Sequence, residues 1–203
     1  CDGNGFEVFV GPYSLSFKGS APLLAASTVG ELEHAEMAGK IILLHGQIAR
    51  EQLMPKNFVF YNPEESRKII SLLEKGQPAA VISATGRNSA LAGGVYPFPL
   101  IEDGDFDIPS VYMTEEEGVR LLAHTGSTVS LESVSERIPG KGYNVIAVRG
   151  PEDAERIIVT AHIDAKKGTR GAIDNATGVI TLMLLAGLLR DYDGSRQIEL
   201  AAF

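Results

Sequence analysis

The strongest constraint on the fold lies near the end of the chain, where two apolar strands flank an apolar helix. Residues 155–162 (ERIIVTAH) and 196–203 (RQIELAAF) each carry the apolar run of a buried strand. Between them, residues 175–192 (NATGVITLMLLAGLLRDY) are apolar nearly all round, which predicts a helix buried in a larger body. This strand–helix–strand order predicts a parallel α/β sheet covered on both faces.

The C-terminal block from residue 139 is short for such a sheet. A further strand is expected at 143–150, joined to 155–162 by a charged turn. The chain stops inside its last expected strand, whose neighbours and covering helices would have to come from elsewhere. We therefore expect the chain to be a fragment of a longer protein.

The preceding region alternates short strands and helices. A helix is expected at 63–76, since it starts with Pro63, stops at Gly76 and carries apolar residues on one side. The other expected elements are strands at 6–17 (one or two), 39–46, 79–86, 108–114 and 127–134, and a short helix at 115–124.

Composition excludes some classes of function. The net charge of −8 argues against nucleic acid as a partner, because phosphate would be repelled. No apolar run is long enough to span a membrane. Cys1 is the only cysteine, so no internal disulfide can form, which suits either a bacterial cytoplasmic or an exported protein. Cys1 could be a lipid-attachment residue, but without a signal segment we favour an arbitrary start of the chain.

Three polar side chains stand beside the apolar segments of the C-terminal block. His162 and Asp164 lie where the strand 155–162 ends, and their spacing of two in extended chain points them to the same side. Asp174 directly precedes the apolar helix, where the helix dipole favours an ionised carboxylate. An imidazole with carboxylates is a ligand set for a divalent metal, with zinc the natural candidate.

Simpler explanations exist for each residue alone. An H-x-D triplet occurs by chance in many chains, and Asp174 and Asn175 could merely cap the helix. The metal hypothesis is favoured by the combination, on a strand end and at the start of the next helix.

The segments TAHIDA (160–165) and GAIDNATGV (171–179), preceded by YNVIAVRG (143–150), resemble the metal-binding core of the zinc-dependent aminopeptidases. That family includes bacterial leucyl aminopeptidase and aminopeptidase Y, with glutamate carboxypeptidase II as a more distant relative. The resemblance implies a site with two zinc ions. It gives His162 as a ligand of one zinc, Asp174 as the carboxylate that bridges both, and Asp164 as the catalytic-site acid that orients the histidine ring. It also implies a cis Asp174–Asn175 peptide.

The middle of the chain resembles the protease-associated domain, a β-rich module often carried by this family. The resemblance rests on GKIILLHG, AAVISATG and IPSVYMTEEEGVRLL, in that order. The implied fold is α/β: a partial zinc-exopeptidase core with a parallel or mixed sheet, plus an inserted protease-associated domain. Residues 1–19 would be strands of the peptidase body, 20–138 the protease-associated domain, and 139–203 part of the catalytic domain.

The sequence also departs from the family. The catalytic glutamate, the adjacent ligand glutamate and a later aspartate and histidine would follow a strand like 196–203, and none is present. Glu199 lies too early, inside that strand. Three of five metal ligands are thus missing, so we expect weak or no zinc binding and no activity from this chain alone.

The implied function of the intact protein is removal of N-terminal residues from peptides. Two alternatives remain open: a peptidase-like binding module without catalysis, and a carboxypeptidase or other amide hydrolase on the same metal frame. Peptide substrate is the expected partner, and the oligomeric state is unknown.

Two loops are conspicuous but less informative. Residues 54–66 are rich in aromatic residues and proline, as binding loops can be, and we expect Phe58, Phe60 and Tyr61 to belong to a small core or a domain interface. The acidic group within 102–107 lacks the ligand spacing of an EF-hand loop, so a solvated turn is favoured over a calcium site.

Overall fold

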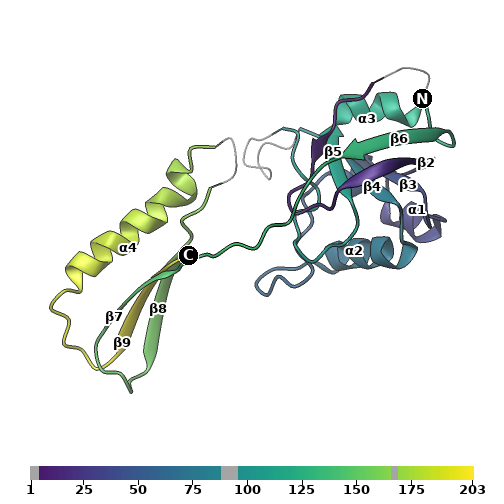
Figure 1. The fold of residues 1–203 in the computed structure, drawn as a ribbon. Coiled ribbons are helices and arrows are strands. Elements are labelled where there is room, and N and C mark those ends of the chain that lie inside the picture. Colours follow the sequence, from purple (N-terminus) through teal and green to yellow (C-terminus); the bar gives the residue numbers. More distant parts are fainter. Residues whose placement is uncertain (1–4, 88–95, 166–168) are drawn as a thin grey trace. The chain divides into compact units, whose positions relative to one another are not determined.

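The computed structural model describes residues 5–87, 96–165 and 169–203, which form two compact units, residues 1–138 and 139–203. Cys1 lies outside the described residues. Each unit is an α/β structure with its own sheet and core (Figure 1). Among the described residues, no helix has both the length and the apolar character needed to cross a membrane.

Unit 1 is built on a six-stranded sheet with the order β1-β5-β4-β3-β2-β6. The four central strands are parallel and the two edge strands run antiparallel to their neighbours. The strands are β1 (Phe9–Val10), β2 (Phe17–Ala26), β3 (Ile41–Leu44), β4 (Ala80–Thr85), β5 (Ser110–Thr114) and β6 (Thr128–Ser133).

Helices cover both faces of this sheet. Helices α1 (Val29–His34) and α2 (Glu64–Gly76) lie on one face, where Leu32 and Leu73 are fully buried. Helix α3 (Glu115–Leu122) lies on the other face and contributes Leu121 to the second core (Figure 1). All four residues of β3 are buried because this strand is covered on both sides.

The expected elements of unit 1 are present with small shifts in their ends. The strand expected at 127–134 shows strict alternation of exposed and buried residues, as its sequence predicts. The segment 6–17 differs, because only Phe9–Val10 form a strand there and β2 starts at Phe17. Both strands pair within the sheet of unit 1, through β5 and β6 respectively.

Arg137 fastens the end of unit 1 to two of its loops. Its guanidinium donates to the Tyr13 carbonyl (2.7 Å), to the Phe106 carbonyl (2.9 Å) and to Asp107 (2.7 Å). We expect Arg137→Ala to lower the free energy of unfolding of unit 1 by about 1–2 kcal/mol, because two loop carbonyls lose a charged donor. Urea unfolding measures this, and Arg137→Lys should recover only part of the loss, since an ammonium cannot reproduce the fork.

Unit 2 holds a three-stranded mixed sheet with the order β7-β9-β8. Strand β9 (Gln197–Ala202) lies in the centre, antiparallel to β7 (Val145–Arg149) and parallel to β8 (Arg156–Ala161). The purely parallel sheet expected from strand–helix–strand order is therefore wrong for β7, and the mixed sheet of the fold assignment is observed. Glu199 lies inside β9 and pairs with Arg156 at 2.9 Å.

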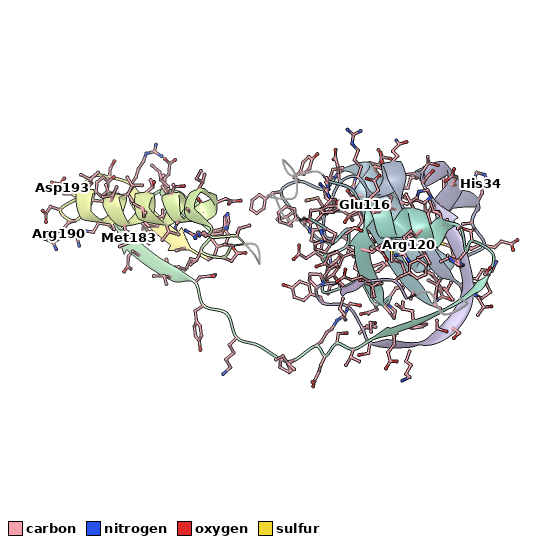
Figure 2. The ribbon with its side chains drawn as sticks, turned by 90° about the horizontal axis from the view of Figure 1, so that it is seen from above. His34, Glu116, Arg120, Met183, Arg190 and Asp193 are labelled. Carbon is pink, nitrogen blue, oxygen red and sulfur yellow. The ribbon has the colours of Figure 1, made fainter. Side chains whose placement is uncertain are left out.

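Helix α4 (Thr177–Leu188) packs along one face of this sheet (Figure 1). It was expected to be buried on all sides, and this is wrong for the chain as described: Leu182 is its only buried residue, while Met183 and Leu188 are 70% and 80% exposed. Figure 2 shows its side chains standing off the ribbon on several sides. Helix α4 therefore has more apolar surface than its contact with this sheet buries.

Candidate metal centre

His162 is held where β8 ends. The sheet ladder continues past the strand, because the Phe203 amide donates to the Ala161 carbonyl and the Ile163 amide to the Phe203 carbonyl. This pairing keeps the backbone on both sides of His162 extended, so the imidazole leaves the sheet at its carboxyl edge. Ligands gather at this edge in sheets of parallel strands.

Asp174 and Asn175, at the start of α4, have different contacts: Asn175 caps the helix and Asp174 contacts His162. Asn175 accepts a hydrogen bond from the Gly178 amide at 3.0 Å and so caps the first turn of α4. A Cβ atom at position 178 would lie only 2.5–2.8 Å from the side-chain amide of Asn175, so this cap requires glycine at that position. The carboxylate of Asp174 instead lies against His162. The peptide between Asp174 and Asn175 is cis, as the resemblance predicted.

The imidazole of His162 contacts a carboxylate on each side. Nδ1 lies 2.9 Å from Asp164 Oδ1, and Nε2 lies 2.9 Å from Asp174 Oδ1. An imidazole that donates from Nδ1 to a carboxylate has its Nε2 lone pair free for a metal, and this partner fixes the tautomer. The fold thus brings the three residues together, with the His162 ring between Asp164 and Asp174.

The spacing of His162 and Asp174 suits two ligands of one ion. Donors about 2.1 Å from a tetrahedral zinc lie about 3.4 Å apart, so the observed 2.9 Å requires only a small opening. Asp164 occupies the far side of the ring and cannot share that ion. Within residues 5–87, 96–165 and 169–203, no group of three or more His, Cys, Asp or Glu could hold a metal.

The hydrogen bond that the His162 ring donates to Asp164 raises the pKa of His162 above its ordinary value of 6.5, with a smaller electrostatic contribution from Asp174. We expect Asp164→Asn to lower this pKa in protein kept metal-free with EDTA, because the partner loses its charge. Titration of the ring followed by NMR measures the change. An unaltered pKa in the variant would contradict the contact.

The direction of this shift sets its effect on stability. Because the pKa is higher in the folded chain, the protonated ring stabilises the metal-free fold below about pH 6.5, and this contribution is lost as the pH rises through the raised pKa. Zinc binding has the opposite pH dependence, because zinc binds the neutral imidazole and is therefore favoured as the pH rises.

Two of the remaining histidines have other partners. The ring of His34 hydrogen-bonds the Gly30 carbonyl at 2.7 Å, and His124 packs edge-on against Phe6. The acidic group in 102–107 is not simply a solvated turn, because Asp103 is buried and accepts from the amides of Lys56 and Asp105. Gly178 was not predicted from the sequence to be a functional residue, although its spacing of three from Asn175 is the signal of a side-chain cap.

The C-terminal part of the chain is similar to known peptidases. Residues 144–203 match peptidase family M28. This M28 segment contains β7, β8, α4 and β9, and therefore His162, Asp164 and Asp174. Aminopeptidase YwaD of Bacillus subtilis (strain 168) is 25% identical over 108 residues, which cover 52% of this chain and 23% of that protein.

Solved structures with the same fold match almost the whole chain. A zinc aminopeptidase from Bacillus subtilis aligns with 99% of it at 21% identity and a TM-score of 0.59. The aminopeptidase of Aneurinibacillus sp. strain AM-1 aligns with 97% at 21% identity and a TM-score of 0.58. The chain covers 46% of each of these structures, so it spans less than half the length of its relatives. The resemblance to zinc aminopeptidases is confirmed, whereas the protease-associated domain in unit 1 stays a prediction.

Proposed function

We propose that the chain supplies part of the metal site of a co-catalytic di-zinc aminopeptidase, which removes N-terminal residues from peptides. The observation that carries the proposal is the His162 ring held between two carboxylates at 2.9 Å. The M28 segment contains all three residues, and relatives of similar sequence or fold are aminopeptidases. In the same proposal, unit 1 is a protease-associated domain.

The residues of the site have separate tasks. His162 Nε2 and an Asp174 oxygen would hold zinc, with Asp174 shared between two ions, while Asp164 is a positioning residue that holds the imidazole tautomer. Bound zinc would polarise the scissile carbonyl and lower the pKa of the attacking water. The described residues offer no third metal ligand beside His162 and Asp174. We therefore propose that these 203 residues are inactive on their own.

Zinc titration of this chain tests that last point. We expect binding weaker than micromolar by isothermal titration calorimetry, because two protein ligands leave most of the coordination shell to water. Asp153→Asn, which alters an exposed turn of the same unit, is the control. Submicromolar binding that disappears in His162→Ala and Asp174→Ala would show a complete site in this chain and refute the proposed inactivity.

A further inference from the structure

Unit 1 carries a groove that shares no residue with the His162 site. Two adjoining cavities, of about 630 and 470 Å³, lie beyond the carboxyl ends of β3 and β4. Both are lined by Gln47 and Arg50, so they form one groove on this edge. In sheets with parallel strands, this edge is where ligands are bound.

One end of the groove presents two guanidinium groups. Arg50 and Arg87 line the larger cavity together with Gly46 and Gly86. Arg50 has no ion-pair partner within the described part of the chain. Arg87 lies 3.6 Å from Glu116, beyond hydrogen-bond distance, and its guanidinium carbon is 5.0 Å from the centre of the Tyr96 ring. Both arginines can therefore still donate to a carboxylate, which they bind in forked geometry.

The other end carries most of the apolar side chains of the groove. Leu53, Met54, Tyr61 and Pro63 line the smaller cavity, and Tyr61 is 67% exposed. Phe58 and Phe60, expected to belong to a small core or a domain interface, are 43% and 88% exposed, so they form no small core within unit 1. An exposed apolar group of this kind is typical of a binding surface.

The loop that forms this apolar end is braced at its base. Lys56 pairs with Glu74 at 2.7 Å, and its amide donates to Asp103 at 2.9 Å. The Asn62 side chain donates to the carbonyls of Pro55 and Lys56, both at 3.1 Å. These bonds close the loop on itself, so Tyr61 and Pro63 are held in place before any ligand arrives. Pre-ordering of this kind lowers the entropy lost on binding.

The charges give the groove a direction. Arg87 and Glu115 line only the larger cavity, where Glu116 lies 3.6 Å from Arg87, whereas Glu51 and Glu65 line only the smaller one; Arg50 lines both. A ligand carboxylate is therefore favoured at the end that has both arginines over the end that has Glu51 and Glu65.

We propose that this groove binds an extended peptide segment in which a carboxylate lies a few residues from an apolar side chain. The carboxylate pairs with Arg50 and Arg87, and the apolar side chain lies against Tyr61 and Met54. Such a site would dock peptide or protein substrates of a peptidase at a second place, and peptide binding itself does not depend on zinc.

Isothermal titration of the 203-residue chain in EDTA tests the proposal. The probes are N-acetylated, C-amidated peptides with one glutamate and one leucine separated by short glycine runs of varied length. We expect at least one spacing to bind, with an affinity about tenfold higher than its glutamine counterpart, because a charge-assisted bond to arginine is lost in the latter. Replacing leucine by glycine should also weaken binding.

Variants locate the site. Arg50→Gln and Arg87→Gln should each weaken binding of the glutamate peptide severalfold and leave the glutamine peptide unaffected. Lys18→Gln, which removes a positive charge from β2, should bind like the original chain. Absence of binding at every spacing, equal affinity for glutamate and glutamine peptides, or unchanged affinity in Arg50→Gln would overturn the proposal. None of these results bears on the zinc site, since EDTA and blocked peptide ends remove its chemistry.

Discussion

Asp174→Asn in the full-length protein is expected to lower kcat/KM for leucine p-nitroanilide by at least about a thousandfold. Asparagine has the shape of aspartate but not its charge, so in the proposed di-zinc site it could not neutralise the two cations. The contact of Asp174 with His162 Nε2, at 2.9 Å, places this carboxylate beside the nitrogen that a zinc ion would use. Metal analysis of the purified variant should show a parallel loss of zinc.

Two further variants separate this role from a structural one. Asp153→Asn changes an exposed carboxylate of the same unit and should retain both zinc and activity. Asp164→Asn should retain zinc more fully than Asp174→Asn but lose activity, since Asp164 lies on the Nδ1 side of the ring and acts through its orientation. An Asp174→Asn protein with full zinc content and undiminished turnover would rule out a bridging carboxylate at this position.

The approach of these three residues could be predicted from the sequence because each sits at an element boundary. The apolar run of β8 fixes where the strand ends, and the start of α4 fixes where Asp174 lies. A strand end and the following helix start meet at one edge of an α/β sheet. The division of labour between Asp174 and Asn175 could not be predicted, because both side chains can cap a helix and only the backbone path between them decides which one does.

The elements of the fold were predictable where the sequence pattern of a segment matches the burial of its residues in the structure. The apolar strands and α2 follow from their own residues, whereas α1 was missed although Thr28 and Glu31 have the spacing of a capping box. The structure shows Thr28 accepting from the Glu31 amide, and Glu31 accepting from Ser27. The short length of this helix and its single buried residue, Leu32, leave little periodicity to recognise.

Strand order depends on partners distant in sequence. Strands β7 and β8 follow each other closely in the sequence, but β9 lies between them in the sheet and pairs with both. The sequence of β7 does not show whether its neighbour is parallel or antiparallel, because an apolar strand can pair in either direction. The exposure of α4 could not be predicted for a similar reason. The sequence of the helix shows how much apolar surface it has, but it does not show which part of that surface other elements cover.

Helix α3 approaches the sheet of unit 1 so closely that Gly118→Ala should be strongly destabilising. A methyl group at Gly118 would lie 2.3 Å from Cβ of Ala84 in β4, and neither atom can rotate away. Glu116 and Arg120 are exposed, on the side of α3 away from the sheet (Figure 2). We expect a loss of about 2–3 kcal/mol in the free energy of unfolding of unit 1, larger than the helix propensity that alanine gains over glycine.

The partner residue supplies the decisive control. Ala84→Gly removes the colliding methyl group and alone should cost about 1 kcal/mol, since glycine weakens a strand. Combined with Gly118→Ala it should restore most of the loss, so that the double variant is about as stable as Ala84→Gly. Hydrogen exchange of the β4 amides measures unit 1 separately from unit 2. Additive losses in the double variant would mean that α3 does not pack on Ala84, and the register of this helix on the sheet would then have to change.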